Sequence, residues 1–384
     1  MKVVFISNYF SHHQRPLSEA LNNLCDYTFI ATQQIPEERK KLGWSSEADD
    51  PAYVVHSSEA RQDSLQKLLR EADLVIAGSA PESLFRERIR EGRLLFRYSE
   101  RPLKHGTEAL KYVPRFLKWH FRNPVGKPIY LLCASAYAAG DYQKFLLFRN
   151  RSFCWGYFPR TIQYDDPEAL IRSKDPQKIL WCGRFLDWKH PDDLLLAARI
   201  LKEKQIPFFL DFIGAGDLCS QLQRLTEEMH LEDCVHFPGA MSPDLVRRRM
   251  EGAGICVVSS DRQEGWGAVV NESMNSGCAL VASHAVGAVP FLMKHEENGL
   301  IYPSGKITAL ANCLEILLKN PAKQRKFGFA AYRTITEEWN AEVAARRILI
   351  LTEAILSGET KRNLFLCGPA SPAPVLDDRF WSFS

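Results

Sequence analysis

The chain has 384 residues, a mass of 43.8 kDa and a net charge of +3, with 46% hydrophobic and 25% charged residues. This composition is typical of a globular protein, and it excludes a disordered chain, a collagen-like repeat and a polytopic membrane protein. The length predicts two to three domains.

The first half of the chain alternates short apolar runs with amphipathic stretches. The predicted strands cover residues 3–7, 27–31, 73–78, 94–99, 129–134 and 153–158. Strands separated by helices form parallel sheets that are covered on both faces. Residues 1–165 are therefore predicted to form a Rossmann-like domain.

Two features of the whole chain bear on the compartment. The apolar run VVFIS after Met1 and Lys2 has only five residues, too few for a signal peptide, and no stretch reaches the ~18 apolar residues that span a bilayer. None of the ten cysteines forms a C-x-x-C pair, and most lie in apolar runs. We therefore expect a cytoplasmic protein with reduced, buried cysteines.

A basic segment lies within the first half. Residues 86–127 hold twelve Lys/Arg and four Glu, a net charge of +8, so the rest of the chain sums to about −5. Its stretch 108–122 interleaves cations with aromatic residues, and Pro114 is expected to break or start a helix there. An interfacial element on anionic lipid is one interpretation, and a solvated basic face is another. Nucleic-acid binding is disfavoured because no recognition motif accompanies the charge.

The strand–helix alternation restarts after Asp165-Asp166-Pro167. Predicted strands cover residues 178–183, 208–214, 234–239, 254–260, 279–283 and 299–303, with helical patterns at 192–204 and 218–230. Residues 166–335 are therefore predicted to form a second Rossmann-like domain. The pattern at 322–357 indicates a long helix, whose part from 336 to 357 lies beyond that domain, and residues 358–384 are expected to be an irregular tail.

Ligands of open parallel sheets bind at the carboxyl ends of the strands, so the residues after each strand are candidates for chemistry. Gly183 follows one strand, and after it Arg184 and Lys189 are placed to reach one anion; the alternative is a solvated loop with two surface cations. The turn IGAGD (213–217) resembles a dinucleotide fingerprint, but Cys219 stands where that fingerprint needs Gly or Ala. An NAD site is therefore disfavoured.

A third segment, DRQEGWG (261–267), precedes the predicted helix AVVNESMNSG. Gly265 and Gly267 expose backbone N–H groups at a helix N-terminus, which suits phosphate. Glu264 and Glu272 are eight residues apart, or roughly 12 Å along a helix, which is too far for the carboxylate pair of a retaining glycosidase. This spacing suits two ends of one elongated ligand, although Glu272 as an exposed helix residue is an equal alternative.

Together these segments resemble the donor-binding domain of family 4 retaining glycosyltransferases, the glycosyl transferases group 1. The resemblance covers residues 178–320 and is carried by Gly183-Arg184 with Lys189, IGAGD, Phe237-Pro238-Gly239, EGWGAVVNE, SMNSGCALVAS and VGAVPFLMKHEENGLIYP. It implies the GT-B fold: two Rossmann-like parallel-sheet domains facing a central cleft, with a long C-terminal helix crossing back to the first domain.

The resemblance also implies roles. Arg184, Lys189 and Glu264 would be catalytic: the two cations would bind the donor diphosphate, and Glu264 would bind donor-sugar hydroxyls without acting as a nucleophile. Donor binding would further involve Glu272 at the ribose, together with Gly183, Gly214, Gly239, Gly265, Trp266 and Gly267. The reaction would retain anomeric configuration. The sequence has no D-x-D triplet, and two cations can stabilise a leaving diphosphate, so we predict no metal and no cofactor.

On the acceptor side the sequence departs from the family. The loop after the first strand lacks glycine, and a cleft-facing His is absent after the fourth strand. His12 and His13 are candidates to face the acceptor, and Arg15 to face the diphosphate, or else the histidines make local hydrogen bonds. Glu100 is a candidate to position or deprotonate the acceptor with Arg101 as its partner, or else it forms an ordinary surface ion pair.

We therefore expect transfer of a sugar from a nucleoside diphosphate to a hydroxyl acceptor, in cell-envelope polysaccharide or lipid-linked glycan synthesis. The expected partners are the nucleotide sugar, a glycan or lipid-linked acceptor and, through residues 86–127, the inner face of an anionic membrane. Two alternatives stay open: a GT-B nucleotide-sugar epimerase, which would need no acceptor, and a non-catalytic GT-B scaffold.

Overall fold

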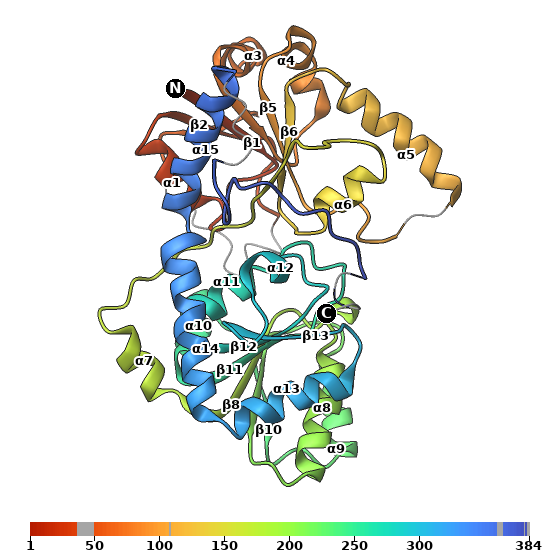
Figure 1. Ribbon diagram of the computed structural model, residues 1–384, viewed down its shortest axis with the longest axis vertical. Helices are drawn as coiled ribbons and strands as arrows, with labels where there is room; N and C mark the ends of the chain where they lie inside the picture. Colours follow the sequence, from red (N-terminus) through yellow and green to blue (C-terminus); the bar gives the residue numbers. More distant parts are fainter. Residues whose placement is uncertain (37–49, 107–108, 359–363, 380, 382–384) are drawn as a thin grey trace. The chain divides into compact units, whose positions relative to one another are not determined.

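The computed structural model describes residues 1–36, 50–106, 109–358, 364–379 and 381 (Figure 1). The chain forms two compact units: residues 1–160 with 339–377, and residues 161–338 with 378–384. Each contains one parallel sheet, so the predicted pair of Rossmann-like domains is confirmed. The division at residue 160 falls five residues before the predicted boundary.

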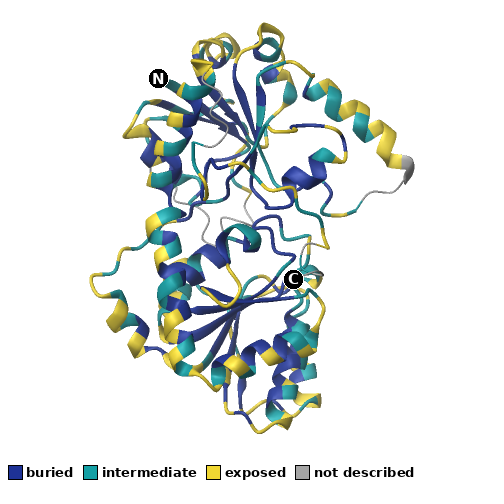
Figure 2. Ribbon diagram, in the orientation of Figure 1, coloured by how far each residue is buried: buried dark blue, intermediate teal, exposed yellow. Residues whose placement is uncertain are grey.

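The first unit is built on a seven-stranded sheet in the order β3-β2-β1-β4-β5-β6-β7. Its strands are β1 Lys2–Ser7, β2 Asp26–Ala31, β3 Val54–His56, β4 Leu74–Ala77, β5 Leu95–Ser99, β6 Ile129–Cys133 and β7 Ser152–Cys154. All four residues of β4 are buried, as in a sheet covered by helices on both sides. Figure 2 shows buried residues along the strands of this sheet. Strand β3 has only three residues and was not among the predicted strands.

The helical elements of this unit are α1 Arg15–Asn22, α3 Gln62–Glu71, η2 Glu82–Phe85, α4 Arg86–Glu91, α5 Ala109–Arg122, α6 Ala138–Gln143 and α15 Ala341–Leu356. Pro114 lies inside α5, so the expectation that it would break or start a helix is wrong. A proline removes one backbone hydrogen bond, and the turns on both sides of it continue the helix.

The C-terminal part of the chain returns to the first unit. Helix α15 packs on α1, and it begins where the Asn340 side chain accepts a hydrogen bond from the Val343 N–H at 2.9 Å. The tail then covers the edge of β7: Cys154 N–H donates to Ser371 O at 2.7 Å, and Ala370 N–H donates to Cys154 O at 2.8 Å. Strand β7 is shorter than predicted, since it ends at Cys154.

The long helix expected over residues 322–357 is divided. Helix α14 spans Pro321–Arg333, a π-helical turn follows at Thr334–Glu338, and α15 starts separately at Ala341. The prediction rested on the spacing of apolar residues, which does not show where a side chain such as Asn340 caps the start of a new helix.

The second unit is built on a six-stranded sheet in the order β10-β9-β8-β11-β12-β13. Its strands are β8 Asp175–Cys182, β9 Phe209–Ile213, β10 Val235–Gly239, β11 Ala253–Val258, β12 Ala279–Ser283 and β13 Gly299–Tyr302. Its other helical elements are α7 Pro167–Ser173, η3 Asp187–Lys189, α8 Pro191–Glu203, α9 Cys219–Glu228, α10 Pro243–Gly252, α11 Ala268–Asn275, α12 Val289–Leu292 and α13 Ile307–Leu318. Every predicted strand of this unit is present; β11 and β12 are buried throughout, whereas β10 includes exposed residues.

All ten cysteines are free; Cys367 is exposed. Within the described residues no helix combines the length and the apolar character needed to cross a bilayer.

Candidate functional site

The predicted donor residues gather after four strands of the second unit. Gly183 directly follows β8, Gly214 follows β9, Gly239 ends β10, and the segment from Glu264 to Gly267 lies between β11 and α11. Because all strands are parallel, these positions share the carboxyl edge of one sheet.

Three of these glycines bring the loops together through backbone contacts. Gly183 N–H donates to Ile213 O at 3.0 Å, and Gly214 N–H donates to Gly239 O at 3.1 Å. Gly214 has φ of +152°, and a Cβ atom there would lie 1.8 Å from Gly183 O. No side chain fits at Gly214 without moving the loop that carries Arg184.

Replacing Gly214 with alanine is expected to lower the free energy of unfolding by about 3 kcal/mol, at the upper end of overpacking costs. Gly239→Ala is the matched control: its φ is +83°, but nothing lies within 4 Å of the added methyl group. The control carries only backbone strain of about 1–2 kcal/mol. Urea unfolding measures both variants, and equal losses would contradict the steric argument.

Lys189 and Glu264 form the centre of the site. Lys189 Nζ lies 2.5 Å from Glu264 Oε2, and the two side chains are only 14% and 13% exposed. Ser260 Oγ donates to the same carboxylate oxygen at 3.1 Å, and Lys189 Nζ lies 4.7 Å from the Trp188 ring centroid. The structure thus brings together a cation and an acid that the sequence separates by 75 residues.

A buried hydrogen-bond chain holds this pair in place. The Trp181 indole donates to Ser259 Oγ at 2.9 Å, and Ser259 Oγ donates to Lys189 O at 2.7 Å. Asp261 N–H donates to Trp188 O at 2.9 Å. The loop after β8 is therefore bonded to the loop after β11. Ser259 and Ser260 were not among the predicted site residues, although both end the apolar run GICVVSS.

Arg184 differs from Lys189. Its side chain is exposed and has no ion pair with an acid among the residues that the structure describes. The expectation that Arg184 and Lys189 reach one anion stays a prediction, since Lys189 is paired with Glu264.

The loop before α11 turns through a glycine in the left-handed region. Gly267 has φ of +89°, and a Cβ atom there would lie 2.9 Å from Val286 Cγ1. Within the described chain, no backbone hydrogen bond outside helices and strands uses the N–H of Gly265 or Gly267. Trp266 is buried, and its indole donates to Asn271 Oδ1 at 2.8 Å. The side chain of Trp266 thus anchors the loop, and its two neighbours offer N–H groups.

Glu272 lies within α11, but Glu264 precedes the helix, which begins at Ala268. The estimate of 12 Å assumed one continuous helix, and that assumption is wrong. Burial raises the pKa of Glu272, and Arg247 partly opposes the rise. Burial, followed by the charge of Glu272, raises the pKa of the Cys182 thiol to about 12, and the charge of Lys189 opposes this rise. Glu272 and Lys189 thus act on the same thiol at the end of β8.

His190, which the sequence analysis did not select, adjoins this site. It has φ of +46°, and its Nε2 lies 3.4 Å from Asp261 Oδ2, an interaction that raises the pKa of His190. His190, Asp192 and Asp193 offer possible ligand atoms within 4.8 Å of one another. The two aspartates occupy the first turn of α8, where the helix dipole accounts for them, so we assign no metal here.

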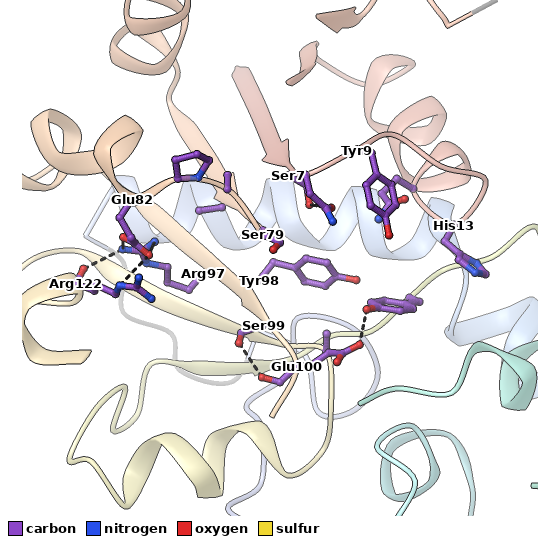
Figure 3. A pocket seen from close by; sticks show the side chains of 18 of the residues that line it. Ser7, Tyr9, His13, Ser79, Glu82, Arg97, Tyr98, Ser99, Glu100 and Arg122 are labelled. Atoms are coloured by element: carbon purple, nitrogen blue, oxygen red, sulfur yellow. Dashed lines mark hydrogen bonds and ion pairs between the residues drawn. The ribbon is translucent and has the colours of Figure 1, made fainter. Parts of the chain in front are cut away.

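A cavity of about 590 Å³ lies in the first unit, at the carboxyl ends of β1, β4 and β5 (Figure 3). Its lining includes Ser7, Asn8, Tyr9, His13, Ser79, Glu82, Arg97, Tyr98, Ser99, Glu100, Trp119, Arg122, Asn123, Tyr142 and Tyr157. Hydroxyl, amide and aromatic groups dominate this wall, and its two carboxylates balance its two guanidinium groups.

One end of the cavity is braced by Arg97. Its Nη1 and Nη2 donate to the two Glu82 carboxylate oxygens at 3.2 and 2.9 Å, and its Nε donates to Asn123 Oδ1 at 3.0 Å. Figure 3 shows this cluster, with Arg122 beside it, at the opposite end from His13. Arg122 joins the same cluster, since its Nε lies 3.7 Å from Glu82 Oε1 and its guanidinium lies over the Trp119 ring.

Glu100 occupies another part of the cavity wall. Tyr157 Oη donates to its Oε1 at 2.6 Å, and Lys104 Nζ donates to its Oε2 at 3.1 Å. Burial, followed by the charge of Glu100, raises the pKa of Tyr157. Tyr157 lies in the predicted strand 153–158 and was missed, because that segment was expected to be sheet and not loop.

Of the remaining acceptor-side candidates, only some line the cavity. His13 lines the cavity, and its ring stacks on Tyr157 with centroids 6.2 Å apart. His12 and Arg15 are not among the lining residues; Arg15 forms an ion pair with Glu19 at 3.7 Å. Arg101, expected to pair with Glu100, instead forms a buried two-point ion pair with Asp141.

Comparisons with known proteins find one family for the second half of the chain. Residues 163–334 match the family model of the glycosyl transferases group 1. Over 185 residues, 47% of this chain and 45% of the relative, the sequence is 30% identical to the amylovoran biosynthesis glycosyltransferase AmsK of Erwinia amylovora. Over 188 residues, 48% of this chain and 47% of the relative, it is 27% identical to N-acetyl-alpha-D-glucosaminyl L-malate synthase of Bacillus anthracis. The alignments thus span about half the length of these curated relatives.

Solved structures are similar over nearly the whole chain. The chain aligns with Anabaena HepE in complex with UDP at a TM-score of 0.67 and 14% identity, covering 92% of this chain and 100% of that one. It aligns with WaaG, a glycosyltransferase involved in lipopolysaccharide biosynthesis, at a TM-score of 0.61 and 14% identity, covering 91% and 99%. At this identity the similarity shows the fold, and it confirms the GT-B class.

Proposed function

We propose that this protein is a glycosyltransferase that moves a sugar from a nucleoside diphosphate to a hydroxyl acceptor, because residues 163–334 match the family model of the glycosyl transferases group 1. The observation that carries the proposal is the Lys189–Glu264 pair at the carboxyl edge of the second sheet, beside a glycine loop with available N–H groups. Polysaccharide biosynthesis is the proposed context, as in the names of AmsK and of the putative colanic acid biosynthesis glycosyltransferase WcaL of Escherichia coli.

Cleavage of a nucleotide sugar develops negative charge on the departing diphosphate. In our proposal Lys189 and Arg184 stabilise that charge, with N–H groups of Gly265 and Gly267 as further donors. Glu264, held by Lys189 and Ser260, accepts hydrogen bonds from hydroxyl groups of the donor sugar, and Glu272 binds the ribose. Because fixed cations can balance the diphosphate, we propose that the reaction needs no metal ion.

Retention of anomeric configuration is also part of the proposal. None of the residues discussed is assigned as a nucleophile, and Glu264 is already bonded to Lys189. The acceptor would therefore attack the face from which the diphosphate leaves. The anomeric configuration of the product, measured by NMR, tests this point.

We propose the cavity of the first unit as the acceptor site. It lies at the strand ends where parallel sheets bind ligands. Its aromatic rings and its hydroxyl, amide and carboxylate groups suit the two faces and the hydroxyl groups of a sugar. Glu100 is the proposed group that positions the attacking hydroxyl, and association of residues 86–127 with an anionic membrane would bring a lipid-linked acceptor to it.

Thermal-shift measurements with UDP, other nucleoside diphosphates and their sugars test the proposal. A ligand at 100 times its Kd stabilises the folded state by about 2.7 kcal/mol. For a unit of this size that is a rise in Tm of about 5–10 °C. A protein whose Tm is unchanged by every nucleotide would contradict the proposed donor site.

Product analysis with donor alone distinguishes the rival enzyme. A nucleotide-sugar epimerase converts its donor without an acceptor, whereas a transferase turns over only with acceptor present, apart from slow hydrolysis. If the donor alone were converted to an epimeric nucleotide sugar, the protein would be an epimerase and the proposed transfer reaction would be wrong. The proposed donor site would still hold.

A further inference from the structure

Helix α5 presents three different strips along its length. Tyr112, Phe116, Trp119 and His120 share one side, while Val113, Leu117 and Phe121 recur every fourth residue on another. Lys111 and Lys118 lie beside that second strip, about two turns apart. A surface helix ordinarily turns polar residues to solvent, so an outward apolar strip needs an explanation.

The first strip attaches the helix to its own unit. The Tyr112 ring stacks on Phe145 with centroids 5.3 Å apart, and the Trp119 ring meets Tyr142 edge-on at 5.1 Å. His120 Nε2 lies 2.9 Å from Phe145 O. This side is therefore satisfied by the fold, and the outward strip is not needed to hold α5 in place.

The outward strip, Val113, Leu117 and Phe121, is exposed. Leu117 is 63% and Phe121 is 77% exposed, and Val125, just beyond the helix, is 82% exposed. Figure 2 shows exposed residues along the length of α5 at the periphery of the first unit. Large apolar side chains so regularly spaced and so exposed mark an interaction surface.

Charge favours one occupant. Lys111 and Lys118 are exposed beside the outward strip, and the whole segment 86–127 carries a net charge of +8 from twelve Lys/Arg and four Glu. A helix whose apolar side chains are flanked by lysines is suited to the interface of an anionic bilayer. Its apolar strip faces the acyl chains, and the lysine ammonium groups lie at the headgroups. A second copy of this chain would bring like charges together.

We propose that α5 docks the first unit on an anionic phospholipid membrane through Val113, Leu117 and Phe121, with Lys111 and Lys118 at the headgroups. The same helix also builds the cavity: Trp119, Arg122 and Asn123, at its end, line it. Docking therefore holds the cavity within about one helix diameter, 10–12 Å, of the membrane surface.

The consequence for the acceptor rests on the proposed transferase function. A cavity held that close to the headgroups receives the sugar of a lipid-linked acceptor without lifting the lipid out of the bilayer. The acceptor class that fits is therefore a saccharide joined to a membrane lipid. Docking itself does not depend on sugar transfer, so the two ideas are tested separately.

Co-sedimentation with vesicles tests the docking. The full chain is expected to bind vesicles of phosphatidylglycerol and phosphatidylcholine at least tenfold more tightly than vesicles of phosphatidylcholine. Leu117→Gln with Phe121→Gln should lower the partition coefficient at least tenfold, as should Lys111→Glu with Lys118→Glu. The matched controls are Leu245→Gln with Ile350→Gln, and Arg224→Glu with Lys326→Glu, which change exposed residues on other helices and should leave binding unchanged.

Three outcomes would overturn the proposal. In the first, the wild-type chain does not bind the anionic vesicles. In the second, the Leu117/Phe121 variant binds them as well as the wild type does. In the third, sedimentation velocity shows that the wild type is a dimer and that, among the variants, only the Leu117/Phe121 variant is a monomer. Each variant must keep the Tm of the wild type and its nucleotide-induced shift. A chain that binds vesicles but no nucleotide would refute the proposed transferase and leave docking standing.

Discussion

Replacing Lys189 with alanine is expected to lower kcat for sugar transfer at least about 100-fold, the usual cost of removing one group that stabilises charge in a transition state. In the structure Lys189 Nζ is the mostly buried cation 2.5 Å from Glu264. Its removal takes a positive charge from the proposed diphosphate site and leaves Glu264 with the Ser260 hydroxyl. Glu264→Gln is expected to lower kcat to a similar extent, since an amide is a weaker acceptor for sugar hydroxyls.

Lys178→Ala is the matched control for charge. Lys178 forms an ion pair with Asp211 at 3.0 Å in the same sheet, with side chains 24% and 11% exposed, but it lies within β8, whereas Lys189 follows the end of that strand. This variant should retain turnover, which radiolabelled donor or coupled release of the nucleoside diphosphate measures. Circular dichroism must show that all three variants are folded. Wild-type turnover in both Lys189→Ala and Glu264→Gln would refute the assigned site.

Asp141→Ala is expected to destabilise the first unit by about 3–5 kcal/mol, because it leaves a buried guanidinium without its counter-charge. Arg101 and Asp141 have side chains only 1% and 2% exposed, and Arg101 Nε and Nη2 each donate to Asp141 at 3.1 Å. Leu103 N–H donates to the same carboxylate at 3.1 Å and would also lose its partner. The expected fall in Tm is about 6–20 °C.

Urea unfolding measures this loss. Glu203→Ala breaks an exposed ion pair with Arg199, whose side chains are 56% and 61% exposed, and should cost less than about 1 kcal/mol. Arg101→Met combined with Asp141→Leu removes both charges and should recover much of the loss. A fall for Asp141→Ala no larger than that for Glu203→Ala would contradict the role of this pair.

Much of the fold could be predicted from the sequence, because its evidence is local. The run GICVVSS is apolar on both faces and rich in β-branched residues, and it predicts the buried strand β11. The candidate donor residues follow from the same argument, since parallel strands place their carboxyl ends at one edge. Glycines such as Gly214 and Gly267 mark turns that other residues cannot adopt without strain.

Other features could not be predicted in this way. Strand β3 is too short to show a period, and the division of the C-terminal helix depends on one cap at Asn340. The first-unit cavity gathers Ser7, Glu82, Glu100 and Tyr157 from four separate segments, and no single segment carries a recognisable motif.

The sequence by itself determined the two parallel sheets, the positions of most strands along the chain and the positions of the donor-site loops, since apolar periodicity and glycine are properties of neighbouring residues. The tertiary structure decided which charged groups meet. Lys189 meets Glu264 across 75 residues, and Arg101 takes Asp141, 40 residues away, in preference to the adjacent Glu100. The reason is that the strength of an ion pair depends on distance and burial, which only the packing of remote segments sets.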